Sequence, residues 1–195
     1  MSDILFDQVA CCEVYSAEDL HQHTRPLWSS LCREVMEGAS KEVEEAALSA
    51  LIAVVSVLEA GLTTSASRAA AATLMQEAFA ECESHLEAPE QRLMWPSTRL
   101  LVALVVAAPG PAAAITARVV PQLTRQFVRS DATELACQNT MSALAMVLEA
   151  AAKHSHMLLG QWVATFFRLL YLYSLDVKLA KMSPLTSPFR THGIG

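Results

Sequence analysis

Apolar residues at helical spacing recur along this chain of 195 residues, and the recurrence limits the folds that it can adopt. From Val43 to Leu58 they fall at i, i+3, i+4 and i+7, which places them on one face of an α-helix. Ser40 precedes this run as an N-cap, and Gly61 follows its end. Two further stripes share the spacing: Ile115, Val119, Leu123 and Phe127, and Leu159, Val163, Phe166, Phe167, Leu170 and Val177. No stretch alternates as a strand does, so we predict an all-α fold.

The helices also repeat in pairs. Each predicted second helix carries the dipeptide Ala-Leu, at 50–51, 103–104 and 143–144, so the dipeptides lie 53 and 40 residues apart. These separations bracket the period of about 40–47 residues that is typical of paired-helix repeats. The pattern resembles HEAT repeats, although Glu44 stands where an arginine is common in the second helix of that repeat. We therefore predict an α-solenoid, a HEAT/ARM-like superhelix of stacked helical hairpins.

Three prolines support this reading. Pro26, Pro96 and Pro121 each fall near the start of an apolar helical stripe. A proline inside a helix costs about 3 kcal/mol, but in the first turn it costs little. We expect these helices either to start at the proline or to bend there.

We expect a single solenoid segment over residues 1–181, followed by an irregular tail at 182–195. Its predicted parts are the second helix of a partial repeat at 1–15, full helical pairs at 17–60, 62–108 and 111–153, and an unpaired first helix at 155–181. The unpaired helix presents five aromatic side chains with no following helix to cover them: Trp162, Phe166, Phe167, Tyr171 and Tyr173. An exposed apolar surface of this kind favours self-association of the isolated chain.

Composition argues against several classes of protein. Apolar residues make up 53% of the chain, which is too many for a disordered protein. Pro109 and Pro111 interrupt the charge-free run 100–117, which falls short of the ~20 apolar residues that span a membrane. The first residues, MSDILFDQ, lack a basic residue, so we expect no secretory signal; five cysteines without a CxxC pair indicate reduced thiols. Residues 1–98 carry 16 acidic and 5 basic residues, so we expect no direct nucleic-acid partner.

The stretch between Cys11 and Cys32 gathers cysteines and histidines, but their spacing does not suit a metal site. Side chains two residues apart point to opposite sides of a helix, so His21 and His23 cannot bind one ion from a helix. The adjacent Cys11 and Cys12 diverge as well. A site would form only if a loop folded one of these histidines back onto the two cysteines.

Other candidate groups are also interpreted as structural. Three cysteines in apolar stripes behave as small hydrophobes: Cys32, Cys82 and Cys137. Five carboxylates form a solvated acidic stripe: Glu44, Glu45, Glu77, Glu81 and Glu83. Three tryptophans pack between repeats or, alternatively, anchor a partner: Trp28, Trp95 and Trp162. The chain has no GxSxG and no glycine-rich phosphate loop, so we identify no catalytic, cofactor-binding or metal-binding residue and expect no enzyme.

Three phrases in order, DLHQHTRPLWSSLCRE, EVEEAALSAL and RLMWPSTRLL, resemble the MMS-nineteen family of HEAT-repeat adaptors, named for methyl methanesulfonate sensitivity. The likeness covers about residues 18–102 and is looser to 181. Because that family is several times longer, we expect a fragment or a truncated isoform. The resemblance implies a scaffold subunit of the cytosolic iron–sulfur assembly targeting complex, present in nucleus and cytoplasm and linked to nucleotide excision repair, transcription and the spindle. It implies a WD-repeat subunit and a small acidic subunit as partners, and iron–sulfur helicases and polymerases as clients.

Two alternatives belong to other classes. One is a generic HEAT-repeat interaction module of the transport or microtubule-associated kind. The other is a metal- or redox-active protein that uses Cys11, Cys12, His21 and His23. Unrelated flanking repeats would favour the first, and stoichiometric zinc or iron would favour the second.

We predict that protein purified without chelators contains well under one equivalent of zinc or iron by elemental analysis, because these groups lack ligand spacing. Replacing both His21 and His23 by alanine should change the free energy of unfolding by less than about 0.5 kcal/mol. A stoichiometric metal that is lost in this double variant would contradict the scaffold interpretation.

Overall fold

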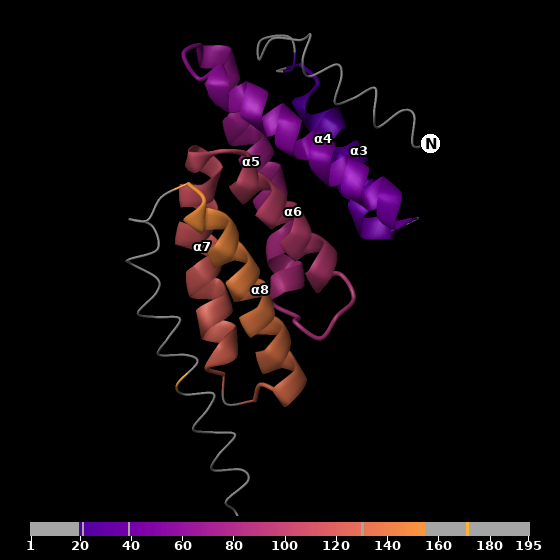
Figure 1. Ribbon diagram of the computed structural model, residues 1–195, viewed down its shortest axis with the longest axis vertical. Helices are drawn as coiled ribbons and strands as arrows, with labels where there is room; N and C mark the ends of the chain where they lie inside the picture. The colour runs from indigo at the N-terminus through magenta and orange to yellow at the C-terminus, as the bar shows by residue number, and fades with distance from the viewer. Residues whose placement is uncertain (1–19, 21, 39, 130, 155–170, 172–195) are drawn as a thin grey trace, which may run out of the picture.

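The computed structural model describes residues 20, 22–38, 40–129, 131–154 and 171, and this part of the chain is helical without a strand (Figure 1). The all-α prediction is confirmed. The helices are α3 (Thr24–Glu37), α4 (Lys41–Ala60), α5 (Ser65–Leu86), α6 (Met94–Ala107), α7 (Pro109–Phe127) and α8 (Glu134–Ala152). The helices expected at 1–15 and 155–181 lie outside the described residues, apart from Tyr171.

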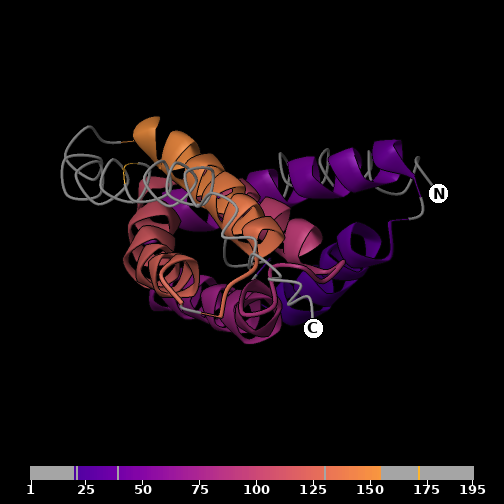
Figure 2. The same cartoon turned by 90° about the horizontal axis from the view of Figure 1, so that it is seen from below.

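The six helices form three stacked hairpins. The hairpins are α3 with α4, α5 with α6, and α7 with α8. Between neighbouring hairpins α3 packs on α5, α4 on α6, α5 on α7 and α6 on α8. Figure 2 shows α4 and α8 on one side of the molecule and α3 and α5 on the other. The stacking confirms the predicted α-solenoid. The first two hairpins lie within 17–60 and 62–108, whereas α7 begins at Pro109, ahead of the range 111–153.

Local sequence signals set the ends of these helices. Ser40 accepts a hydrogen bond from the backbone N–H of Val43 at 3.2 Å, and Thr64 and Thr133 cap α5 and α8 in the same way. Such caps satisfy backbone donors that have no partner within the helix. Gly38 ends α3 with φ 59°, in the left-handed region that favours glycine. Gly61 lies at the end of α4, so both predicted boundaries of that helix are confirmed.

The prolines differ in their positions. Pro26 and Pro96 lie in the first turns of α3 and α6, where a missing N–H is tolerated. Pro121 lies in the interior of α7, which runs from Pro109 to Phe127, so the expectation that it falls near the start of a helical stripe is wrong. The stripe begins earlier, at Ile115, and continues past Pro121 because its side chains are buried on both sides of the proline.

The core is continuous from hairpin to hairpin. Leu51, Leu104 and Leu144 occupy α4, α6 and α8, and their exposed fractions are 0%, 0% and 1%. All three belong to a single apolar cluster that includes residues of every described helix. A cluster shared in this way makes the burial of each hairpin depend on its neighbours.

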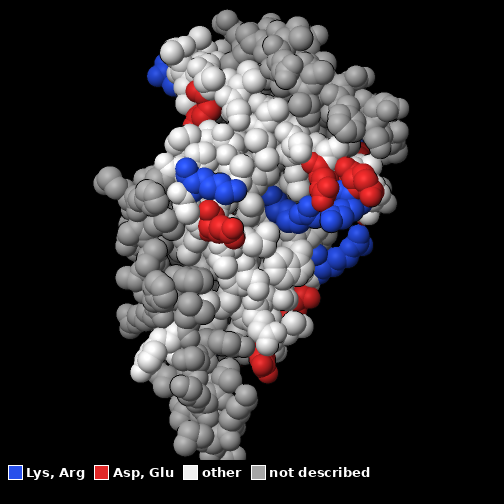
Figure 3. Space-filling view, in the orientation of Figure 1, with Lys and Arg blue, Asp and Glu red and all other residues white. Residues whose placement is uncertain are grey.

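Ion pairs join successive hairpins along both layers. Arg25 of α3 pairs with Glu77 of α5 at 2.9 Å (Nε to Oε1), and Arg99 of α6 pairs with Glu44 of α4. In the next step along the chain, Arg118 of α7 donates to the carboxylate of Glu83 of α5. We call these three pairs the inter-hairpin ladder. On the face drawn in Figure 3 charged side chains form small groups of both signs, separated by uncharged surface.

The ladder corrects an expectation from the sequence. We interpreted five glutamates as a solvated acidic stripe, but three of them make the ladder, and their side chains are only 16–33% exposed. Glu45 pairs with Lys41 in its own helix, and Glu81 is exposed. The arginine partners lie in other hairpins, so helical spacing alone does not reveal them.

We predict that Leu104→Ala lowers the free energy of unfolding by about 2–5 kcal/mol, because it leaves a cavity in the shared core. Leu135→Ala is the matched control: this leucine is 54% exposed on α8, and its truncation should cost less than about 0.5 kcal/mol. Urea unfolding followed by circular dichroism measures both. Equal costs for the two variants would contradict a core that passes through α6.

Candidate functional site

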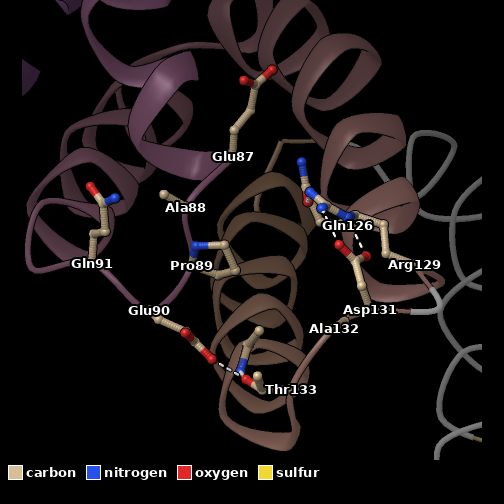
Figure 4. Close-up of a pocket in the computed structure, with 11 residues that line it drawn as sticks. Glu87, Ala88, Pro89, Glu90, Gln91, Gln126, Arg129, Asp131, Ala132 and Thr133 are labelled. Carbon is tan, nitrogen blue, oxygen red and sulfur yellow. Dashed lines mark hydrogen bonds and ion pairs between the residues drawn. The ribbon is translucent and has the colours of Figure 1, made fainter.

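A pocket of about 240 Å³ opens where two hairpins meet, between the loop that joins α5 to α6 and the loop that joins α7 to α8 (Figure 4). We call it the joint pocket. Its described lining residues come from these two loops and the adjacent ends of α5, α7 and α8: Glu87, Ala88, Pro89, Glu90, Gln91, Gln126, Arg129, Asp131, Ala132, Thr133 and Ala136.

Hydrogen bonds between the hairpins fix the first wall. Asn139 of α8 donates from Nδ2 to the carbonyl oxygen of Pro89 at 2.8 Å. The hydroxyl of Thr133 donates to the carboxylate of Glu90, and the same oxygen accepts the backbone N–H of Ala136 at 3.0 Å. The N-cap of α8 thus also holds the loop of the preceding hairpin. The two loops keep their positions because the cap and the loop share one side chain.

An exposed ion pair forms the second wall. Arg129 donates from Nε and Nη2 to the two carboxylate oxygens of Asp131 at 2.9 and 2.6 Å, and from Nη1 to Oε1 of Gln126 at 3.2 Å. The hydrogen bonds from Arg129, followed by one from the backbone of Asp131, lower the pKa of the Asp131 carboxyl below its ordinary 3.8. The same pairing raises the pKa of Arg129. Both groups remain charged at neutral pH, so the bidentate pair orients the guanidinium in the wall.

The chemistry of the joint pocket suits binding. No histidine, cysteine or serine is among its described lining residues. Across the described ranges, no group of three or more His, Cys, Asp or Glu side chains is arranged to hold a metal ion. Carboxylates, amides and one guanidinium beside small apolar residues can recognise another molecule through charge and hydrogen bonds.

The cysteines and histidines singled out in the sequence do not meet here. Cys32 and Cys82 are buried, and burial raises the pKa of the Cys32 thiol to about 12 and that of Cys82 as well. Cys137 is half-buried near the carbonyl of Phe127. His23 lies at the N-cap position of α3 without a side-chain cap bond. Cys11, Cys12 and His21 lie outside the described residues.

Two tryptophans and a histidine are buried or half-buried away from the joint pocket. Trp28 is 4% exposed in α3, in agreement with packing between helices, and Trp95 is half-buried in α6. Trp162 lies outside the described residues. His154 contacts the carbonyl oxygen of Val106 through Nε2 at 3.0 Å and so ties the end of α8 to α6. These side chains hold the hairpins together and do not line the joint pocket.

Sequence reasoning missed the residues of the joint pocket. The only local signals were Pro89 and a polar stretch at 129–133, both of which predict loops. Glu90 and Thr133 are 43 residues apart, and nothing in helical periodicity brings them together. None of the described helices is long and apolar enough to cross a membrane.

No family model matches the chain. The chain is 34% identical over 140 residues to the MMS19 nucleotide excision repair protein homolog of Danio rerio. These residues are 71% of this chain and 13% of that protein. The Xenopus tropicalis homolog is 33% identical over 125 residues, which are 64% of this chain and 12% of the homolog. The Homo sapiens homolog is 32% identical over 118 residues, which are 60% of this chain and 12% of the homolog. The chain therefore matches about an eighth of the length of these curated relatives.

We predict that the Asp131 carboxyl titrates below pH 3.8 in carbon-detected NMR, because Arg129 stabilises the charged form. A lowered pKa in the folded state contributes stability at pH values above the ordinary pKa, and this contribution is lost as pH falls through the lowered value. Arg129→Gln should return the midpoint towards 3.8, whereas Arg125→Gln, at an exposed arginine of α7, should leave it unchanged. A titration midpoint of Asp131 that stays the same in Arg129→Gln would contradict this account of the pair.

Proposed function

Because the chain belongs to the MMS19 family, we propose that it forms part of a helical scaffold that holds other proteins together during nucleotide excision repair. The names of its relatives supply the repair context. The stacked hairpins supply the physical support, because a solenoid extends its binding surface with every added repeat.

One observation carries the proposal: helices pack within their own hairpin and on the adjacent hairpins, and they do not close around a central site in the described part of the chain. The joint between the loops of two hairpins is open, as the joint pocket shows. Such surfaces bind extended or multiple partners, which is the task of a scaffold and not of an enzyme.

The finer proposal is an adaptor role in the cytosolic iron–sulfur assembly targeting complex. In this role the scaffold contacts the WD-repeat subunit and the small acidic subunit, and it brings them to apo forms of iron–sulfur helicases and polymerases in the nucleus and the cytoplasm. The scaffold itself holds no cluster. The resemblance to the MMS-nineteen family motivates this role, and the binding chemistry of the joint pocket agrees with it.

The experiment is a binding measurement with purified proteins. The immobilised 195-residue chain is exposed to the WD-repeat subunit, the small acidic subunit and an iron–sulfur helicase, with the full-length Danio rerio relative as a positive control. We predict that the chain binds at least one of them, and does so more weakly than the full-length relative, because it offers fewer repeats.

Folding must be separated from binding in this experiment. Leu104→Ala serves as a destabilised variant and Glu149→Ala, at an exposed position of α8, as its surface control, and circular dichroism establishes which preparations are folded. A folded chain that binds none of the three proteins at ~100 μM, a concentration that detects even weak complexes, would contradict the adaptor role. Binding to unrelated transport or microtubule proteins instead would favour a generic HEAT-repeat module.

A further inference from the structure

The joint pocket has an unbalanced charge. Its described lining holds the three carboxylates of Glu87, Glu90 and Asp131 against one guanidinium, that of Arg129. Both carboxylate oxygens of Asp131 accept hydrogen bonds from Arg129. Among the described residues no ion pair joins Glu87 or Glu90 to a cation, and Glu90 accepts only the neutral hydroxyl of Thr133. In Figure 4 these two glutamates lie on opposite sides of Pro89. The charge of Glu87 also acts on Arg129 and raises its pKa, but three carboxylates against one guanidinium leave the described lining with two negative charges in excess.

Apolar surface accompanies this charge. The lining includes four residues without a polar side-chain atom: Ala88, Pro89, Ala132 and Ala136. In the sequence, Val128 and Leu135 lie on either side of the loop that joins α7 to α8, and their exposed fractions are 56% and 54%. They are two of the three exposed large hydrophobic residues in the described ranges. Exposed apolar side chains at both ends of a loop that lines the pocket suit a protein-binding surface.

The size of the joint pocket limits its occupant. Its volume of about 240 Å³ is smaller than the roughly 300–1,000 Å³ of sites for drug-sized ligands, so it fits a single side chain better. A long basic side chain matches both features, because its methylene stem packs on apolar surface while its charged head stays near carboxylates. Arginine matches best, since its planar guanidinium can donate to two acceptors at once.

We propose that the joint pocket binds an arginine side chain from an extended segment of a partner protein, whose neighbouring aliphatic residues contact Val128 and Leu135. The inference rests on the proposed function as a protein-binding scaffold. It adds the position of one contact and the chemistry of the partner. Nucleic acid is a poor occupant, because the excess of carboxylates in the lining repels phosphates.

The probe is a capped hexapeptide, Leu-Ala-Arg-Ala-Leu-Ala, titrated into the ¹⁵N-labelled 195-residue chain and followed by NMR. Its control is the same peptide with citrulline, which keeps the shape of arginine and removes the charge. We expect the arginine peptide to shift backbone amide signals of residues 88, 90, 91 and 131–133, and the citrulline peptide to bind about tenfold more weakly. Equal affinities for the two peptides overturn the proposal.

Paired variants test the carboxylates. Glu87→Gln with Glu90→Gln removes two charges from the joint pocket and leaves amide oxygens that can accept from Thr133. Glu45→Gln with Glu149→Gln removes two charges from exposed positions on α4 and α8, outside the lining. We expect the first pair to weaken arginine-peptide binding about tenfold and the second pair to leave it unchanged. Circular dichroism establishes that both proteins are folded.

Several outcomes overturn the inference. They are no spectral shift at ~10 mM peptide, shifts confined to other surfaces, or equal losses in the two pairs of variants. The failure of the proposed function has a different signature. If the chain binds the WD-repeat subunit but does not distinguish arginine from citrulline, only the inference about the pocket fails. If the arginine peptide binds in the pocket and none of the three complex proteins binds the chain, the adaptor role fails.

Discussion

The fold depends on burial of apolar surface between neighbouring hairpins. A pair of helices such as α5 and α6 has apolar residues on two sides, and a single hairpin cannot cover both. Leu104 illustrates the constraint: it lies on the middle second helix, which packs on α4 and on α8, and it is fully buried. Each buried leucine stabilises the fold by about 1.5–3 kcal/mol through removal of apolar area from water, which makes this the dominant favourable term. Stability is therefore a property of the stack, and each hairpin requires its neighbours.

The inter-hairpin ladder has a different role. Its pairs are partly exposed, and pairs of that kind contribute at most about 1 kcal/mol each, which is small beside the core. What they supply is register, because apolar contact alone tolerates sliding of one hairpin on the next. Arg118 makes the most contacts: it donates to Glu83, and its guanidinium lies 4.4 Å from the ring centroid of Phe79. Gln122 adds a hydrogen bond to the backbone of Glu83 one turn further on. These contacts fix the placement of the third hairpin on the second, and with it the position of the joint pocket.

The joint pocket follows from stacking in the same way. Neither of its loops encloses a space alone, and the walls meet because Asn139 and Thr133 bind the preceding loop. A pocket built at such a joint depends on the angle between the two hairpins that form it. The joint pocket is thus built by two hairpins together and not by one element.

The sequence by itself determined the local structure and the class of fold. Apolar spacing located the stripes of α4 and α7, Ser40 and Gly61 marked the ends of α4, and the recurring Ala-Leu dipeptides placed buried leucines on three second helices. These signals act over about one turn of helix, so they are visible in a linear string. Only the tertiary structure decided the partners of Glu44, Glu77 and Glu83, the tolerance of Pro121 within α7, and the site itself. Arg118 lies 35 residues from Glu83, and Asn139 lies 50 from Pro89. Such pairs meet because whole hairpins pack face to face, and no periodicity of the sequence encodes which polar groups then fall opposite one another.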